Sequence, residues 1–346
     1  MSAHTAFTEL PVVDIHGLYS TDPAERQATA DKLGAAARAA GFLYVTGHGV
    51  DPALIAGLRR QAQALFELPL ASKERFHVGQ SRNHSGYVPQ GEEEVYPGVV
   101  DYKEAYDINY DLGRDDPRPM LGRTQWPELT ALPGFRTDVE AYYRAALALG
   151  NLLFRGFALA LGLDEDRFTR HISTPPSQLR LIHYPYNPDA PADQPGIGAH
   201  TDYECFTILL PTAPGLEVLN GAGEWIDAPV LPDAFVINIG DMLEALSNGE
   251  FVATQHRVRK VAEERYAFPL FCNLDYDTVI EPLPEFVSAS RPARYPALVC
   301  GEHLFAQTAQ TFTYLKSRLA SGELVLPAAS RPVSSFGQRP EAGICD

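Results

Sequence analysis

Residues 196–210, Gly-Ile-Gly-Ala-His-Thr-Asp-Tyr-Glu-Cys-Phe-Thr-Ile-Leu-Leu, contain two short β-prone runs, Gly198–Asp202 and Phe206–Leu210, in close succession. Runs of the same kind recur at short intervals after residue 175, and Gly, Pro and Asn separate them. The other members of the series are Leu179–Tyr184, Leu216–Leu219, Phe235–Ile239, Val252–Val258 and Tyr266–Phe271. Many short strands punctuated by turn residues favour an antiparallel sandwich or barrel over a parallel sheet.

Helix and strand signals alternate in the first half of the chain. Asp22 is a suitable N-cap for a helix with Pro23 at its first position. The alanine-rich run that follows should continue to Ala40, because Gly41 favours a helix end. Further strands are expected over Leu10–Ile15 and Phe42–Thr46, and further helices over Pro52–Phe66, about Asp138–Leu161 and Gly301–Leu319.

These patterns divide the chain into three regions. We expect residues 1–175 to form an N-terminal helix and strand region that packs on a core over residues 176–320. Within the first region, residues 77–135 are rich in Gly, Pro and Tyr and are predicted to form loops with short strands. Residues 321–346 are predicted to be a tail, loosely ordered from Pro327.

The composition argues against several classes of partner. A net charge of −16 repels the phosphate backbone, so nucleic acid is not expected to bind. No run reaches the roughly 18 apolar residues that a membrane span needs, and residues 1–11 lack the features of a signal peptide. We therefore expect a cytoplasmic protein. The four cysteines form no C-x-x-C pair and are expected to be buried thiols: Cys205, Cys272, Cys300 and Cys345.

His200 and Asp202 carry the sharpest chemical signal in the chain. In a strand, residues two positions apart point to the same face, so the imidazole and the carboxylate would lie side by side. His256, in another short β-prone run, can supply a third metal ligand. Two histidines and one carboxylate leave neighbouring coordination positions open, which suits iron(II) and dioxygen chemistry.

The residues alone leave alternatives open. Zinc enzymes also use two histidines and a carboxylate, and an isolated His-x-Asp is common in surface turns. The other eight histidines lack a comparable setting and are expected to be surface or hydrogen-bonded core residues: His4, His16, His48, His77, His84, His171, His183 and His303.

Motifs spread over roughly residues 10–320 occur in a characteristic order. They are Leu10–Ile15, Ala40–Gly49, Leu179–Pro185, His200–Asp202, Pro214–Val218, Phe235–Asp241, Ser247–Gly249, His256–Val258 and Pro282–Pro284. With these motifs the chain resembles the isopenicillin N synthase-like family of iron(II)/2-oxoglutarate-dependent dioxygenases. It is also similar to bacterial members such as the ethylene-forming enzyme, in Ser85–Val88, Gly91–Glu93, Gly196–Tyr203 and Gly301–Phe305.

The resemblance implies a mainly β fold with flanking helices, whose core is a distorted jelly-roll or double-stranded β-helix. It implies iron(II) as the metal, 2-oxoglutarate as the co-substrate and dioxygen as the oxidant. It also implies a small-molecule substrate that is hydroxylated, desaturated or cyclised while 2-oxoglutarate is decarboxylated to succinate.

The resemblance also points to residues that hold 2-oxoglutarate. Family members bind its far carboxylate with an arginine and with a serine two positions later. Arg265 occupies the arginine position, whereas Ala267 lacks the hydroxyl, as in the ethylene-forming branch. Tyr184 matches a tyrosine that often helps to hold 2-oxoglutarate, and Arg180 is a second candidate cation.

Substrate recognition is expected to come from the loops before the core and from residues near the ligands. The candidates are Tyr87, Glu93, Tyr96, Tyr106, Tyr203 and Phe271. Glu93 could meet a cationic group, although Gly91–Glu94 is also typical of an exposed acidic turn. The expected partner is a small molecule, with neither nucleic acid nor membrane, and the chain is expected to be a monomer or a weak homo-oligomer.

Two alternative activities stay open beside the 2-oxoglutarate-dependent oxygenase. Ala267 is compatible with an iron(II) oxidase of the same fold that does not use 2-oxoglutarate. Isopenicillin N synthase is an oxidase of this kind. The second alternative is a 2-oxoglutarate-consuming enzyme of the ethylene-forming type. A non-catalytic binding protein is disfavoured, because all three metal ligands are present.

Overall fold

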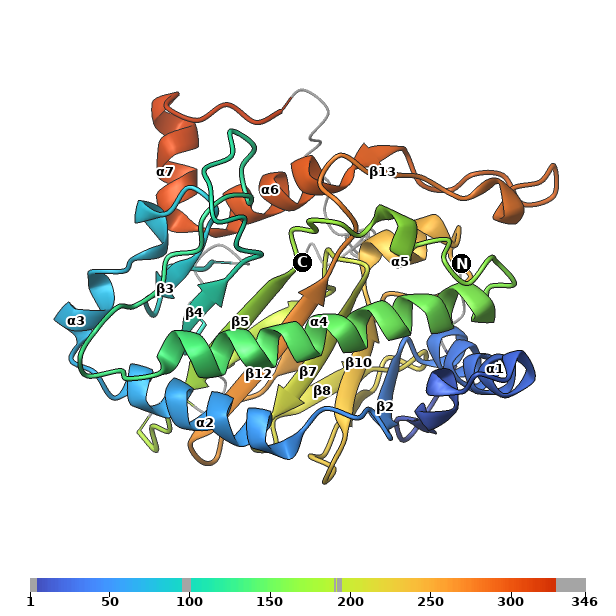
Figure 1. Cartoon of the computed structure of the whole chain (residues 1–346), viewed down its shortest axis with the longest axis horizontal. Coiled ribbons are helices and arrows are strands. Elements are labelled where there is room, and N and C mark those ends of the chain that lie inside the picture. Colours follow the sequence, from blue (N-terminus) through green and yellow to red (C-terminus); the bar gives the residue numbers. More distant parts are fainter. Residues whose placement is uncertain (1–4, 95–100, 190, 192–194, 328–346) are drawn as a thin grey trace, which may run out of the picture.

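The computed structural model describes residues 5–94, 101–189, 191 and 195–327, and its centre is a sandwich of two β-sheets (Figure 1). The larger sheet contains, in spatial order, β1 (Val12–Asp14), β2 (Phe42–Thr46), β10 (Phe235–Ile239), β7 (Phe206–Pro211), β12 (Arg265–Cys272), β5 (Gln178–Tyr184), β4 (Glu104–Ile108) and β3 (Gly86–Val88). The smaller sheet contains β6 (Ile197–His200), β11 (His256–Val258), β8 (Leu216–Leu219) and β9 (Trp225–Asp227). A separate pair consists of β13 (Val279–Ile280) and β14 (Leu298–Val299).

Seven α-helices lie in the described part of the chain. They are α1 (Pro23–Ala39), α2 (Pro52–Phe66), α3 (Leu70–Glu74), α4 (Phe135–Ala160), α5 (Asp241–Leu246), α6 (Cys300–Thr311) and α7 (Thr313–Ser321). Short 3-10 turns cover His16–Tyr19, Val78–Gln80, Thr169–His171 and Pro284–Phe286. No described helix has the length and apolar character required to cross a lipid bilayer.

The two sheets face each other across a shared apolar interior. Val218 of β8 packs in one cluster with Tyr44 and Val236 of the larger sheet. Val258 of β11 packs in another cluster with Ile182 of β5. Apolar side chains that leave water in this way contribute about 25 cal/mol for each Å² buried. The smaller sheet, which carries two of the predicted metal ligands, is therefore held against a rigid wall.

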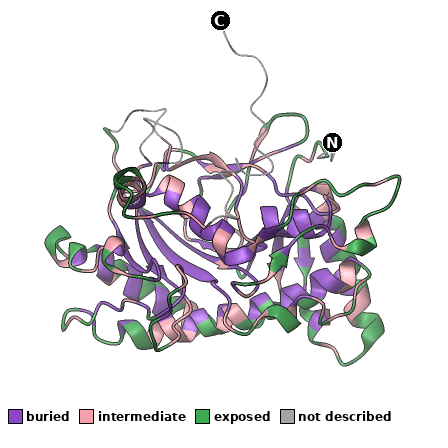
Figure 2. Ribbon diagram, turned by 90° about the horizontal axis from the view of Figure 1, so that it is seen from above, coloured by how far each residue is buried: buried purple, intermediate pink, exposed green. Residues whose placement is uncertain are grey.

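The outer face of the larger sheet is covered by helices. The long helix α4 crosses the strands and has α1 and α2 beside it (Figure 1). Most residues in the strands of the larger sheet and on the inward faces of these helices are buried, whereas the outward faces of the helices are exposed (Figure 2). Among the described strand pairs of the two sheets, only β1 and β2 run parallel. These findings confirm the predicted fold class, a mainly β jelly-roll core with flanking helices.

Local sequence signals set the ends of the N-terminal helices. The Asp22 side chain accepts a hydrogen bond from the backbone N–H of Ala24, and Pro23 occupies the first turn of α1 as predicted. Gly41 follows the helix with φ of +67°, a conformation that glycine adopts without steric cost. Asp51 caps α2 in the same way as Asp22 caps α1.

Several predicted elements are wrong in their extent, and three of them bear on the site. Strand β6 ends at His200, so the strand does not reach Asp202. Strand β11 begins at His256, and residues 252–255 lie outside it. The single helix predicted over residues 301–319 is broken at Phe312, whose backbone is extended with φ of −86° and ψ of 129°. Phe312 pairs with Glu93 in an isolated β-bridge, so a tertiary contact interrupts the helix.

The prediction of buried thiols is confirmed for three cysteines. Cys205, Cys272 and Cys300 are buried and unpaired in disulfides. Cys345 lies outside the described residues, as does the tail from residue 328.

Candidate metal centre and cofactor pocket

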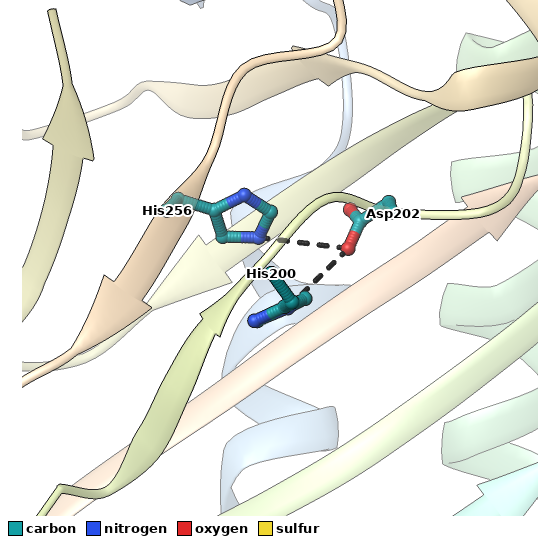
Figure 3. Close-up of side chains that lie close together, drawn as sticks. All are labelled: His200, Asp202 and His256. Atoms are coloured by element: carbon teal, nitrogen blue, oxygen red, sulfur yellow. Dashed lines mark ion pairs between the residues drawn. The ribbon is translucent and has the colours of Figure 1, made fainter. Parts of the chain in front are cut away.

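The structure brings the three predicted metal ligands together at one end of the smaller sheet (Figure 3). His200 is the last residue of β6 and His256 is the first residue of β11, and the two are direct partners in the antiparallel register. Asp202 lies in the loop after β6. Its Oδ1 is 3.6 Å from Nε2 of His200 and 3.5 Å from Nε2 of His256. One ligand atom from each side chain lies within 4.8 Å of the others.

Backbone carbonyls orient both imidazoles. Nδ1 of His200 lies 2.8 Å from the carbonyl oxygen of Gly198, and Nδ1 of His256 lies 3.2 Å from that of Thr254. A ring nitrogen beside a carbonyl carries the hydrogen and donates it, so Nε2 keeps its lone pair. The two lone pairs are directed toward Asp202, where they can bind a cation.

The electrostatics of the site suit a divalent metal. Burial, followed by the neighbouring His256, lowers the pKa of His200 to about 4, so its imidazole is neutral at pH 7. Burial would raise the pKa of Asp202, but His256, His200 and the Thr207 hydroxyl outweigh it and lower that pKa. Neutral imidazoles and an ionised carboxylate are the forms that bind metal. Two histidines and one carboxylate that leave adjacent positions open fit iron(II).

Arg265 and Tyr184 lie opposite each other in neighbouring strands β12 and β5. Arg265 is only 1% exposed, and its guanidinium lies 4.6 Å from the centre of the Tyr184 ring. Nε donates to the carbonyl oxygen of Ala213, and the Tyr184 hydroxyl is also hydrogen-bonded to the guanidinium, but Nη1 has no partner. Among the described residues no carboxylate pairs with Arg265, and burial lowers its pKa. A buried guanidinium with a free N–H fits an incoming carboxylate, such as that of 2-oxoglutarate.

A cavity of about 110 Å³ opens beside the metal ligands. Its lining includes His200 and Asp202 and the predicted residues Arg180, Glu93, Tyr203 and Phe271. Tyr203 lines this cavity from the loop that follows β6. A larger hollow of about 640 Å³ shares no lining residue with this cavity.

Arg180 and Glu93 are paired with other residues inside the cavity wall. Arg180 forms a two-pronged ion pair with Asp107, at 2.6 and 2.8 Å, and contacts Glu93 at 2.6 Å. Lys103 contacts Glu93 at 2.8 Å. Neither predicted residue therefore has a free charge, and Arg180 is poorly placed to receive a second carboxylate.

The remaining predicted substrate residues lie elsewhere. The Tyr87 hydroxyl donates a hydrogen bond to Glu104, and the Tyr106 hydroxyl donates one to the backbone carbonyl of Gln125. Both tyrosines are buried in the main apolar cluster. Neither belongs to the lining of the cavity. Tyr96 lies outside the described residues.

The lining of the cavity also includes three titratable residues that were not predicted, namely His84, Lys103 and Glu204. Glu204 lies two positions after the proposed metal ligand Asp202. This closeness in sequence was the one signal that could have identified it as a residue of the site. His84 and Lys103 reach the cavity only because β3 and β4 pair with each other and β4 pairs with β5. Their sequence context gave no comparable signal.

Comparisons with known proteins agree with this geometry. Residues 10–129 match the family described as non-haem dioxygenase in morphine synthesis N-terminal, and residues 175–274 match the 2OG-Fe(II) oxygenase superfamily. The chain is 34% identical over 326 residues to a homoarginine-6-hydroxylase of Oryza sativa subsp. japonica, covering 88% of this chain and 98% of the relative. It is 32% identical to the isopenicillin N synthase of Streptomyces clavuligerus, covering 85% and 93%.

A solved structure supports the same assignment. A full-length protein of Neurospora crassa, crystallised in complex with alpha-KG, superposes with a TM-score of 0.75 at 26% identity, covering 92% of this chain and 98% of that protein. Alpha-KG is 2-oxoglutarate. The extent of these matches, together with the His-Asp-His cluster, shows that the chain belongs to the 2OG-Fe(II) oxygenase superfamily and is an iron(II)/2-oxoglutarate-dependent dioxygenase.

Proposed function

We propose that His200, Asp202 and His256 bind the iron and that Arg265 binds the far carboxylate of 2-oxoglutarate. The cavity bounded by Tyr203 and Phe271 then receives a small organic substrate. Iron(II) and 2-oxoglutarate, when bound, would together generate an oxidant from dioxygen, and 2-oxoglutarate would be converted to succinate and carbon dioxide. The substrate is most simply hydroxylated, and desaturation or cyclisation are the other outcomes of the same chemistry.

The guanidinium of Arg265 is the single observation that carries the 2-oxoglutarate assignment. A buried cation without a counter-ion costs several kcal/mol, so its site is stabilised by a ligand carboxylate. The Tyr184 hydroxyl lies beside it and can take the place of the hydroxyl that Ala267 lacks. This arrangement argues against an oxidase that works without 2-oxoglutarate.

The residues of the chain have three tasks in this reaction. The metal ligands and Arg265 orient the co-substrate, and the walls of the cavity orient the substrate bond that is oxidised. The apolar side chains of Ile182, Ile197 and Phe312 help to keep water away from the reacting atoms.

An anaerobic titration tests the proposal. Iron(II) and 2-oxoglutarate together should produce a visible charge-transfer band, and a substrate panel that begins with homoarginine should yield succinate in air. Arg265→Ala should raise the 2-oxoglutarate KM steeply, whereas Arg144→Ala, on the exposed face of α4, should leave it unchanged. Turnover that persists without 2-oxoglutarate would contradict the proposal.

The finer properties of the protein are also proposals. The net charge of −16 supports a protein that repels nucleic acid and stays a monomer or weak homo-oligomer. Three buried free thiols support a cytoplasmic location. The matches over residues 10–129 and 175–274 support a division into an N-terminal region of residues 1–175, a core of residues 176–320 and a tail of residues 321–346.

A further inference from the structure

We propose that the cavity beside the metal centre binds substrates through a positively charged nitrogen group, an amine or a guanidine, and that Glu204 receives this group. The inference rests on the proposed function, because it names the substrate class of the same site. Three features of the cavity support it: its charge balance, the setting of Glu204 and the setting of His84.

Three residues of the cavity lining, Arg180, Lys103 and Glu93, belong to an ion-pair network in which carboxyl groups outnumber cations. Arg180 pairs with Asp107 and Glu93, and Lys103 pairs with Glu93 and with Asp101 at 3.0 Å. Two cations therefore face three carboxylates, and each cation is bound to two of them. An anionic substrate would find no free cation in this network and would meet an excess of like charge.

Glu204 adds a further carboxyl to the same cavity. Its side chain lines the cavity next to Asp202 and Tyr203. Among the described residues its carboxyl has no ion-pair partner, and the structure shows no hydrogen bond to it from any other side chain. The oxygens of a carboxyl group that lines a pocket without such partners are available to a ligand, and an ammonium or guanidinium group can donate charge-assisted hydrogen bonds to them. This setting distinguishes Glu204 from Glu93, whose charge is balanced by two internal cations.

His84 is a second and independent sign of a polar ligand. It is 4% exposed and lines the cavity, yet its Nε2 has no hydrogen-bond partner. Nδ1 lies 2.6 Å from the Tyr314 hydroxyl, and the ring packs edge-on against Phe312. Burial lowers the pKa of His84 to about 3, so its ring is neutral and does not repel a cation.

The backbone of His84 supports the same interpretation. Its φ is +56°, in the left-handed region that residues other than glycine seldom adopt. Strained residues of this kind persist where the surrounding structure fixes a side chain for function. The side chain of Thr201, 1% exposed with an unpartnered hydroxyl, lines the cavity as well. Buried polar atoms without partners point to hydrogen bonds that a ligand completes.

Matched ligands test the charge requirement directly. The protein, loaded with iron(II) and 2-oxoglutarate without oxygen, is titrated calorimetrically with L-arginine and with L-citrulline, which is similar in shape but carries a neutral end group. L-Lysine separates an amine from a guanidine, and L-glutamate represents anions. We expect at least one of the two cations to bind about tenfold or more tightly than citrulline, and glutamate to bind most weakly.

Variants then assign the preference to a residue. Glu204→Gln keeps the shape of the side chain and should reduce the preference for the cation to less than about twofold. The matched control Glu128→Gln removes an exposed carboxylate elsewhere and should retain the full preference. His84→Ala should weaken binding of arginine and citrulline alike, because the imidazole contributes a neutral hydrogen bond.

The results separate this inference from the proposed function. A wild-type protein that binds iron and 2-oxoglutarate but prefers citrulline or glutamate, or binds neither cation at millimolar concentration, overturns the inference alone. Full preference in a folded, iron-loaded Glu204→Gln variant overturns the role of Glu204. If the Glu204→Gln variant loses iron, Glu204→Asp replaces it in the test. Glu204→Asp should bind arginine more weakly than wild type but still prefer arginine to citrulline. Equal affinities of Glu204→Asp for arginine and citrulline would also overturn the role of Glu204. Failure to bind 2-oxoglutarate refutes the proposed function instead.

Discussion

Asn238 donates a hydrogen bond of 2.7 Å from Nδ2 to Oδ2 of Asp202, which leaves Oδ1 directed at the two imidazoles. The Thr207 hydroxyl donates to the same Oδ2. Asn238 of β10 and Thr207 of β7 are direct partners in the larger sheet. The larger sheet therefore fixes the carboxylate of a metal centre whose imidazoles come from the smaller sheet.

This contact predicts that Asn238 controls the affinity for iron. Loss of a hydrogen bond to a metal-binding carboxylate usually weakens metal binding by about 10–100-fold. We expect Asn238→Ala to raise the iron(II) dissociation constant by that factor, measured by anaerobic titration. Asn151→Ala, on the exposed face of α4, is the control. Equal affinity in both variants would show that the contact does not position Asp202.

Removal of a proposed ligand should abolish iron binding without unfolding the chain. His200→Ala and His256→Ala each leave at most two protein ligands, too few to retain iron through gel filtration. His171→Ala, at an exposed position, should keep one iron per chain. Metal analysis together with circular dichroism measures both effects, and an iron-loaded His256→Ala variant would refute the ligand assignment.

The Tyr184 hydroxyl should contribute to 2-oxoglutarate binding. Tyr184→Phe removes a hydrogen-bonding group beside Arg265 while it keeps the ring, so we expect the 2-oxoglutarate dissociation constant to rise about tenfold, or about 1.4 kcal/mol. Tyr186→Phe, at an exposed tyrosine, is the matched control. A dissociation constant unchanged by Tyr184→Phe would leave Arg265 as the only support for that carboxylate.

His183 should make stability depend on pH. Burial alone would lower its pKa, but hydrogen bonds to Glu104 and Glu264 outweigh burial and raise it. The folded protein then holds a proton more tightly than the unfolded chain, whose histidine pKa is about 6.5. The stabilisation is fully present below about pH 6.5 and is lost as the pH rises through the raised folded value.

Denaturant unfolding at two pH values measures this effect. The free energy of unfolding of wild type minus that of His183→Gln should be larger at pH 6 than at pH 9. Comparison with the variant cancels the contributions of other titrating groups. A difference that stays constant between the two pH values would show that His183 is not protonated preferentially in the folded state.

Local signals in the sequence were sufficient for many elements. The Asp-Pro pairs at residues 22–23 and 51–52 begin helices where capping rules place them, because a side-chain oxygen beside the first turn satisfies a free backbone N–H. Strands Phe42–Thr46, Leu216–Leu219 and Phe235–Ile239 match their predicted ranges. The resemblance in the ordered motifs added the fold and the family, both of which the comparisons confirm.

Tertiary contacts decided what local propensity left open. Residues 301–319 have helical character throughout, yet the helix breaks at Phe312, since its backbone pairs with Glu93 and its ring is buried against His84. Asp202 likewise reaches the metal centre from a loop, held by Asn238, and strand alternation has no part in its position.

The sequence by itself therefore determined the β-rich core, the two imidazoles with their carboxylate, and the arginine that we propose as the 2-oxoglutarate ligand. Only the tertiary structure decided which charges in the cavity are neutralised and which remain available. Glu93, Arg180 and Lys103 belong to three different segments, and their pairing depends on the register of strands that are distant in sequence. Ion pairs of that kind have no local signature, because they form only when the folded sheet brings the side chains within contact distance.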